Sequence, residues 1–302
     1  MKKLSYVLAV VGIAILAVSC NNTKNEAVQN TDQSNSAETK ENDHKEIKQS
    51  NVEKVKELLS SFSTGNEDPI KYINPNKYIQ HNLGAADGVE GLKTLMEFLS
   101  KTKPSVKIVR IFSDGDYVVA QTEYGYETPT VGFDIFRFEN GLIVEHWDNL
   151  QAIPPTNPSG HSLIDGDTTI KETDKAGLEA NKKVAEGFVT DILMGKNPKN
   201  LENYFDGNNY IQHHPLIGDG LDGLKTGLEK MTKMGLTFKY SKIHKILGEG
   251  NFVLVVSEGV MADKPTSFYD LFRIENGKIA EHWDIVETIP PVKDHKNKNG
   301  KF

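Results

Sequence analysis

The chain has 302 residues, of which 37% are hydrophobic and 25% charged, the composition of an ordinary globular protein with one large or two modest domains. Its formal net charge is -7, from 35 Lys and Arg against 42 Asp and Glu. Because binding to phosphates needs basic side chains clustered on one face, this balance argues against a nucleic-acid-binding protein.

The first twenty residues have the three parts of a secretory signal. Two lysines precede an apolar run over residues 4–18, which is too short to span a bilayer comfortably, and small residues lead to Cys20. The five residues that end at Cys20, LAVSC, resemble a bacterial lipobox, in which the cysteine is lipidated and becomes the mature N-terminus. Residues 1–20 are therefore expected to be a lipoprotein signal peptide. A plain secretory signal and an uncleaved anchor are the alternatives.

On this interpretation the mature chain is lipid-anchored in the cell envelope, on the periplasmic or surface face of a bacterial membrane. Cys20 is the only cysteine, so the folded part contains no disulfide and no thiolate metal site. Residues 21–50 are rich in Asn, Thr, Ser, Glu and Lys with almost no apolar residue. They are predicted to be a disordered tether, because such a segment cannot bury enough apolar surface to fold.

The remaining sequence contains an internal repeat. Residues 134–148, DIFRFENGLIVEHWD, are identical to residues 270–284, DLFRIENGKIAEHWD, at eleven of fifteen positions. Upstream, the Tyr-Ile-Gln-His sequence at 78–81 recurs at 210–213. The repeat predicts a first domain over 51–155, a linker over 156–173, a second domain over 174–292 and a flexible basic tail over 293–302.

The elements follow the same order in both copies. Apolar residues at helical spacing predict an amphipathic helix over 52–62 and again over 178–192. A second helix follows each Asp-Gly pair, over 89–99 and 221–231, and four strands rich in Val, Ile, Tyr and Phe come after it. Helices followed by an antiparallel meander indicate the α+β class, with a curved sheet that wraps a helix and leaves a cone-like cavity.

This order of helix, Tyr-x-x-His, Asp-Gly, helix and strands that end in Glu-His-Trp-Asp resembles the SnoaL-like group of the nuclear transport factor 2-like superfamily, over nearly all of both copies. The resemblance implies two tandem cone-shaped domains that act without a cofactor on a small hydrophobic ligand or substrate. Members of the group include polyketide cyclases, isomerases, dehydratases and non-enzymatic binding modules, so the fold does not fix the reaction. Because such domains commonly pair through their sheets, the two copies are expected to form an internal pseudo-dimer.

In SnoaL-like enzymes a pocket carboxylate removes a proton next to a carbonyl, and the resemblance places it at Asp134 and Asp270. Burial among aromatic side chains disfavours the charged carboxylate and raises its pKa towards the working pH, which suits a general base. A structural carboxylate is the alternative. The second copy fits the family better, because it has His213-His214-Pro215 after the tyrosine motif and His244 in its first long strand.

The Asn-Gly turns leave two strand registers open. A two-residue loop sets Asp134 opposite Trp147, whereas a three-residue loop sets it opposite His146. The second register, which charge complementarity favours, also pairs Asp270 with His282 as acid and base. Arg273 and Glu281 then form a structural ion pair on the other face of the sheet.

The other candidates are histidines and aromatic residues. His81 and His213 are expected at the pocket mouth, where they transfer a proton or cap a helix end, and Trp147 and Trp283 are expected in the core or pocket wall. The candidate catalytic residues are Asp270, His282, His213, His244, Asp134, His146 and His81. The candidate pocket residues are Tyr210, Trp283, Phe272, Tyr78, Trp147 and Phe136.

Two functions fit these residues. One is a cofactor-independent cyclase, isomerase or lyase that acts on a small hydrophobic carbonyl compound. The other is a lipoprotein that binds a small ligand or another protein without catalysis. The sequence has no His-x-x-x-His pattern, no Gly-rich phosphate loop and no Gly-x-Ser-x-Gly elbow, so neither a metal nor a cofactor is expected.

Overall fold

The computed structural model describes residues 32–154 and 157–302, with side chains from residue 45 onward. The predicted signal peptide, Cys20 and the first part of the tether lie outside the described residues. All side-chain contacts described below lie within residues 44–302, which form one compact unit. Among the described residues, no helix has the length and apolar character needed to cross a membrane.

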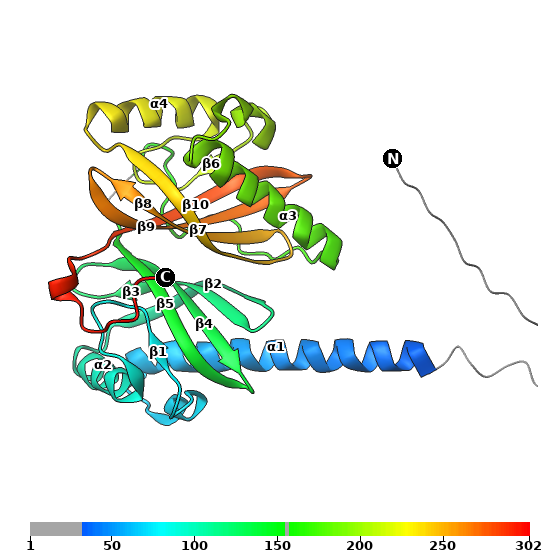
Figure 1. The fold of residues 1–302 in the computed structure, drawn as a ribbon, viewed down its shortest axis with the longest axis vertical. Helices are drawn as coiled ribbons and strands as arrows, with labels where there is room; N and C mark the ends of the chain where they lie inside the picture. The colour runs from blue at the N-terminus through cyan, green and yellow to red at the C-terminus, as the bar shows by residue number, and fades with distance from the viewer. Residues whose placement is uncertain (1–31, 155–156) are drawn as a thin grey trace, which may run out of the picture. The chain divides into compact units, whose positions relative to one another are not determined.

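Each copy begins with helices and continues into strands (Figure 1). The first copy contains α1 (Asp32–Thr64), η1 (Asp68–Tyr72), β1 (Ile79–Gln80), α2 (Gly88–Thr102), β2 (Ser105–Asp114), β3 (Tyr117–Gly125), β4 (Thr130–Glu139) and β5 (Leu142–Ala152). The second contains α3 (Lys175–Phe188), η2 (Val189–Leu193), η3 (Pro198–Tyr204), β6 (Ile211–Gln212), α4 (Gly220–Lys233), β7 (Phe238–Glu249), β8 (Phe252–Met261), β9 (Lys264–Glu275), β10 (Lys278–Thr288) and η4 (Val292–Asp294).

Helix α1 begins earlier than predicted. It runs from Asp32, so residues 32–50 of the expected tether are helical. The reason is that its C-terminal half is fixed by burial of Val55, Leu58 and Leu59, and extending an existing helix adds one hydrogen bond for each residue that is ordered. Glu, Lys and Gln upstream have favourable helix propensities, which allows the extension.

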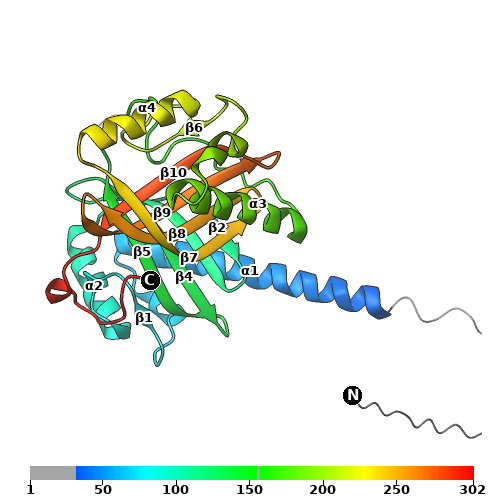
Figure 2. The same cartoon turned by 45° about the horizontal axis from the view of Figure 1, so that its top comes forward.

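The predicted α+β class is confirmed, with two five-stranded sheets in the orders β1-β5-β4-β3-β2 and β6-β10-β9-β8-β7. The four long strands of each sheet are antiparallel, and the short β1 and β6 add a parallel edge next to β5 and β10. Helices α1 and α2 cover the outer face of the first sheet, and α3 and α4 that of the second (Figures 1 and 2).

Both predicted registers are wrong, because Asp134 lies opposite Asp148, and Asp270 opposite Asp284. The turn is a two-residue one, with Glu139 paired to Leu142, but a bulge then inserts one extra residue and shifts the remaining pairs by one. The second sheet has the same irregularity between Ile279 and Glu281. As a result, each histidine of the repeated Glu-His-Trp-Asp sits diagonally from the strand aspartate instead of opposite it.

The inner faces of the two sheets pack against each other in one apolar core, which contains Phe133 and Trp147 from the first copy and Leu271 and Trp283 from the second. Polar contacts cross this interface too. Asn149, which is fully buried, donates through Nδ2 to the carbonyl oxygens of Ser267 at 3.0 Å and Ile285 at 2.8 Å. The two sheets therefore share one buried core, and the copies are not independent domains connected only by a linker.

Two cations stack across the interface in a pseudo-symmetric way. The Arg110 guanidinium lies 4.1 Å from the ring centre of Trp283, and the Lys245 ammonium 3.9 Å from that of Trp147. Arg110 and Lys245 occupy equivalent positions in the first long strand of their copies. Each copy thus places a cation on the tryptophan of the other.

The predicted flexible tail is ordered, which corrects the sequence-based expectation. Asn299 donates through Nδ2 to the Gln80 carbonyl at 3.0 Å, Lys301 is buried and lies 2.9 Å from Glu287, and Phe302 stacks on His244. The tail docks because its polar side chains satisfy backbone carbonyls beside β1, a partner that its composition does not reveal.

The linker makes the matching contact on the second copy. Ser159 donates through Oγ to the Gln212 carbonyl at 2.7 Å, and Leu163 is buried in the core between the sheets. Both segments follow an Ile-Pro-Pro sequence, and each crosses over to the other copy. The copies therefore exchange their C-terminal extensions.

Candidate functional site

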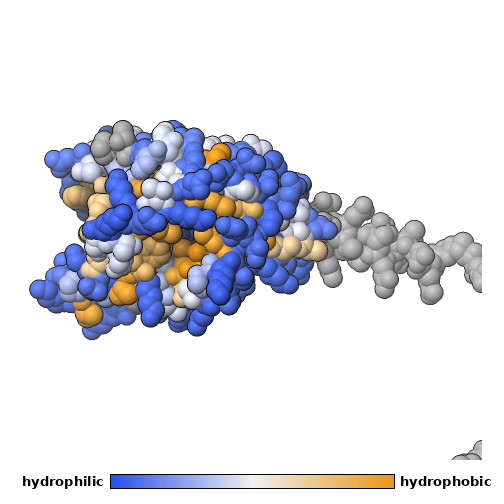
Figure 3. All heavy atoms as spheres, turned by 90° about the horizontal axis from the view of Figure 1, so that it is seen from above, coloured by the Kyte–Doolittle hydropathy of each residue, from blue (hydrophilic) through white to orange (hydrophobic). Residues whose placement is uncertain are grey.

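The second copy contains a cavity of about 50 Å³ between its helices and the outer face of its sheet. Its walls are mainly apolar side chains from α3, η2, α4 and β7, among them Phe188, Leu224 and Met231. Its polar lining comprises Tyr210, Gln212, His214, Tyr240, Asp270, His282 and Asp284. On the face seen from above, apolar residues gather in a hollow between hydrophilic ridges (Figure 3).

Asp270 on β9 is 1% exposed and lies at the polar end of this cavity. Its Oδ1 accepts hydrogen bonds from the Tyr240 hydroxyl at 3.2 Å and from His282 Nε2 at 3.0 Å. Its Oδ2 has no hydrogen-bond partner among the described residues. Burial raises the pKa of Asp270 to about 7, against the opposing effects of Tyr240 and His214.

His282 on β10 holds one oxygen of that carboxylate. Burial lowers the pKa of His282 to about 4, so its imidazole is neutral at pH 7. Because Nε2 faces the carboxylate, Nε2 carries the proton, and Nδ1 is left as an acceptor that has no partner among the described residues. The ring stacks on Phe272 with 4.8 Å between ring centres, which fixes its orientation.

A second histidine and a second aspartate complete the polar end. His214 Nδ1 accepts a hydrogen bond from the Leu216 amide at 3.0 Å, so its proton sits on Nε2, which lies 3.6 Å from Asp284 Oδ2. Burial lowers the pKa of His214 and raises that of Asp284. Among these groups Asp270, with a pKa of about 7, is the one that can exchange a proton near neutral pH.

The first copy has a cavity of about 140 Å³ at the equivalent place, lined by Leu58, Tyr78, Gln80, Asn82, Leu92, Tyr124, Asp134, Phe136, His146 and Asp148, among others. Here both oxygens of Asp134 are engaged, by the Tyr124 hydroxyl at 2.6 Å and by His146 Nε2 at 3.2 Å. Asp148 accepts from Asn82 Nδ2 at 2.6 Å. Asp134, His146 and Asp148 bring one ligand atom each within 4.8 Å of one another, a spacing that would hold a metal ion.

The structure keeps His81 and His213 out of both cavities, which corrects their expected place at the pocket mouth. His213 stacks on Trp283 at 4.6 Å and contacts Glu281 through Nε2 at 2.9 Å, while His81 stacks on Trp147 at 4.7 Å. Neither caps a helix. Successive residues of an extended chain point to opposite sides, so in the second copy His214 reaches the cavity and His213 the inner face.

Other candidates also lie away from the cavities. Trp147 and Trp283 belong to the core between the sheets, so they are core residues and not pocket wall. His244 contacts Glu258 through Nε2 at 3.0 Å and lies beneath Phe302, outside the cavity lining. Of the candidate pocket residues, Tyr210 lines the second cavity, Tyr78 and Phe136 line the first, and Phe272 supports His282 from the core.

The expected contact between Asp270 and His282 is present, although the register that suggested it is wrong. The expected ion pair between Arg273 and Glu281 is present as well, at 2.6 Å. Sequence reasoning missed Asp284 and His214 as cavity residues. Asp284 had a usable signal, because it stands two residues after His282 and strand alternation places both on one face.

The chain matches no protein-family model and no curated protein. Among solved structures, TsrD from Streptomyces laurentii is 21% identical, with 32% of this chain and 88% of that chain covered and a TM-score of 0.29. A candidate polyketide cyclase from Bacillus cereus is 24% identical, with 34% and 74% covered and a TM-score of 0.31. An NTF-2 like protein of unknown function from Burkholderia xenovorans is 18% identical, with 36% and 88% covered and a TM-score of 0.32.

Proposed function

We propose that the cavity of the second copy removes a proton from the carbon next to a carbonyl group of a small hydrophobic compound, without a cofactor. The observation that carries this proposal is the Asp270 carboxylate. It lies at the end of an apolar cavity, has a pKa of about 7, and leaves Oδ2 without a partner among the described residues. A base whose pKa is near the working pH combines a useful ionised fraction with useful basicity.

The neighbouring groups have defined roles in this reaction. Tyr240 and His282 both bind Oδ1, so Oδ2 is the oxygen that accepts the proton from carbon. The electron pair of the broken C–H bond moves onto the carbonyl oxygen, where His214 Nε2–H and the Tyr210 hydroxyl are the available donors. Returning the proton to another carbon isomerises the substrate, whereas attack of the enolate on a second carbonyl closes a ring.

Hydrogen exchange tests this directly and needs no knowledge of the natural substrate. Small ketones and diketones are incubated with the full chain in D₂O, and deuterium uptake next to the carbonyl is followed by NMR. Asp270→Asn should abolish uptake, whereas Asp134→Asn, the matched change in the first copy, should leave it nearly unchanged. Equal uptake by the Asp270→Asn variant and the unmodified chain would contradict the proposal.

We further propose that the chain is a lipoprotein of the cell envelope, anchored through Cys20. The apolar run, the small residues before Cys20 and the absence of any other cysteine in the sequence support this. Expression of Cys20→Ser in a bacterial host should move the protein from the membrane fraction to the soluble fraction or leave the uncleaved signal in place. Mass spectrometry of the N-terminal peptide should show acyl chains on Cys20 only in the unmodified chain.

A further inference from the structure

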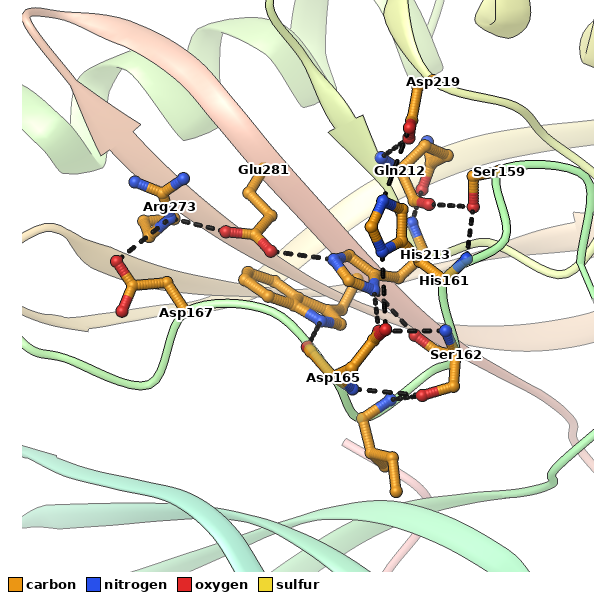
Figure 4. A network of polar contacts seen from close by, with 12 residues as sticks. Ser159, His161, Ser162, Asp165, Asp167, Gln212, His213, Asp219, Arg273 and Glu281 are labelled. Carbon is orange, nitrogen blue, oxygen red and sulfur yellow. Dashed lines mark hydrogen bonds and ion pairs between the residues drawn. The ribbon is translucent and has the colours of Figure 1, made fainter.

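The linker brings a second cluster of metal-ligating side chains together, on the inner-face side of β6 and away from the cavity (Figure 4). His161 and Asp165 come from the linker, and His213 follows β6. One ligand atom of each residue lies within 4.8 Å of the others, and the two imidazole ring centres are 5.2 Å apart. These residues play no part in the proton abstraction proposed above.

The Asp165 carboxylate lies between the two imidazoles. Its Oδ1 is 2.9 Å from His213 Nδ1, and its Oδ2 is 3.4 Å from His161 Nδ1. Both rings thus direct Nδ1 towards the same carboxylate, one to each of its oxygens. Two imidazole nitrogens and one carboxylate oxygen are the donor set that zinc uses in sites that keep an open position.

The outer nitrogen of each imidazole also faces a carboxylate. His213 Nε2 is 2.9 Å from Glu281 Oε1, and His161 Nε2 is 3.4 Å from Asp219 Oδ2. A carboxylate on the far nitrogen of a ligating histidine fixes the tautomer that leaves the near nitrogen free for the metal. Arg273 holds Glu281 in turn at 2.6 Å, so this support is itself positioned.

The loop that carries Asp165 is built tightly. The backbone carbonyl oxygen of Asp165 accepts hydrogen bonds from Trp283 Nε1 at 2.9 Å and from Arg110 Nη2 at 2.6 Å. The next residue, Gly166, has φ +89°, and a Cβ there would lie 2.0 Å from Glu281 Oε1. His213 is fully buried, whereas the side chains of His161 and Asp165 are 34% and 47% exposed, which leaves a path for an ion from solvent.

The first copy provides an internal comparison. His81 stacks on Trp147 and contacts Glu145 at 2.8 Å, as His213 does with Trp283 and Glu281. Its Nδ1, however, is 2.9 Å from the Gly300 backbone carbonyl of the tail. Both segments place a backbone carbonyl on this nitrogen, from Gly300 in the tail and from Ser162 in the linker, but the linker adds a carboxylate and a second imidazole.

We propose that His161, His213 and Asp165 bind a divalent transition metal ion of the zinc type, which fastens the linker to the second copy. On binding, the ion replaces the 2.7 Å contact between His213 Nδ1 and the Ser162 carbonyl, and the imidazole proton lies on Nε2, towards Glu281. The ion occupies the point between the three donors, and its remaining position faces the exposed side of the linker. Oxygen-preferring Mg²⁺ and Ca²⁺ fit this donor set poorly.

Isothermal titration of the full chain, free of any histidine tag, with zinc chloride tests the proposal. We expect the unmodified chain to bind one zinc ion. The affinity for this ion should fall at least about tenfold in both His161→Ala and Asp165→Asn, the usual effect of losing one ligand. The matched control is His295→Ala, which removes a tail histidine outside the cluster and should leave the affinity unchanged. In thermal unfolding, zinc should raise the midpoint of the unmodified chain and not that of the two ligand variants.

Cobalt gives an independent readout, because Co²⁺ bound to nitrogen and oxygen in a four-coordinate site has visible absorption bands. These bands should appear with the unmodified chain and with Asp270→Asn. The loss of deuterium uptake expected in Asp270→Asn is therefore independent of metal binding. Equal zinc affinity in the unmodified chain and in His161→Ala would overturn the proposal. Zinc binding that survives in His161→Ala but is lost in Asp148→Asn would also overturn it, because the ion would then lie in the cavity of the first copy.

Discussion

Replacing Asp270 by Asn should stabilise the protein above neutral pH while it removes the proposed base. The pKa of Asp270 is about 7, against an ordinary value of 3.8, because the cavity walls exclude water from its carboxylate. Folding is therefore favoured by the protonated form. This contribution is complete below pH 3.8 and is lost progressively as the pH rises to about 7. An amide has no charge to bury, so the variant avoids the loss.

The size of the effect follows from the two pKa values. The difference between about 7 and 3.8 corresponds to about 4 kcal/mol at about 1.4 kcal/mol per pH unit. His282 acts in the opposite direction, because its pKa of about 4 lies below the ordinary 6.5, so its stabilising contribution is present above pH 6.5 and lost as the pH falls towards 4. In the unmodified chain the pH dependences of stability from Asp270 and His282 therefore largely offset each other. The variant keeps only the pH dependence from His282.

Urea denaturation of the full chain at pH 4.5, 6 and 8 measures this difference. The Asp270→Asn variant should be more stable than the unmodified chain by about 1 kcal/mol at pH 4.5 and by up to about 4 kcal/mol at pH 8. Asp263→Asn, at an exposed position in the turn after β8, is the control and should show no pH-dependent difference. A stability difference that does not change with pH would refute the reasoning.

Three further changes test the contacts between the copies. Arg110→Lys should lower the free energy of unfolding by about 2 to 4 kcal/mol in urea denaturation, because lysine cannot supply the guanidinium bonds to the linker carbonyls of Ile164, Asp165 and Asp167. Asn149→Ala should cost about 1 to 3 kcal/mol by the same measurement, since it removes the Nδ2 donor that binds the carbonyls of Ser267 and Ile285 across the buried interface; an unchanged midpoint would contradict this. Deleting residues 296–302 should lower the unfolding temperature, more at pH 8 than at pH 5, because Lys301 no longer offsets the charge of Glu287, whose pKa burial raises.

The order of the elements could be predicted because burial leaves a period in the sequence, and the repeat allowed each copy to check the other. The strand register could not. The bulge between Phe138 and Arg137 adds one residue to β5, and the residues around it, Ile143 and Val144, are both apolar and both buried. No change of polarity marks the position where the alternation slips, so counting from the Asn-Gly turn gives the wrong partner for Asp134.

The contact between Asp270 and His282 was predictable because both residues belong to the repeated motif and face each other across one hairpin. The prediction failed where the orientation of a side chain decides whether the residue faces the cavity. His213 and His214 are neighbours of the same type, and only the direction in which β6 adds to the edge of the sheet determines which one faces the cavity. The linker and tail failed for a different reason, because their partners are backbone carbonyls far away in the sequence, which composition does not encode.

The two copies preserve their interface more closely than their cavities, and one position shows how the cavities diverged. His214 of the second copy is replaced by Asn82 in the first, 132 residues earlier. The Asn82 amide donates to Asp148 at 2.6 Å, whereas His214 stays 3.6 Å from Asp284, and each of these two aspartates keeps its Oδ1 without a hydrogen-bond partner among the described residues. With Tyr124 also bonded to Asp134 at 2.6 Å, the aspartates of the first copy are tied to protein donors. In the second copy Asp270 keeps Oδ2 without a partner among the described residues, and this is the oxygen that the proposed reaction uses.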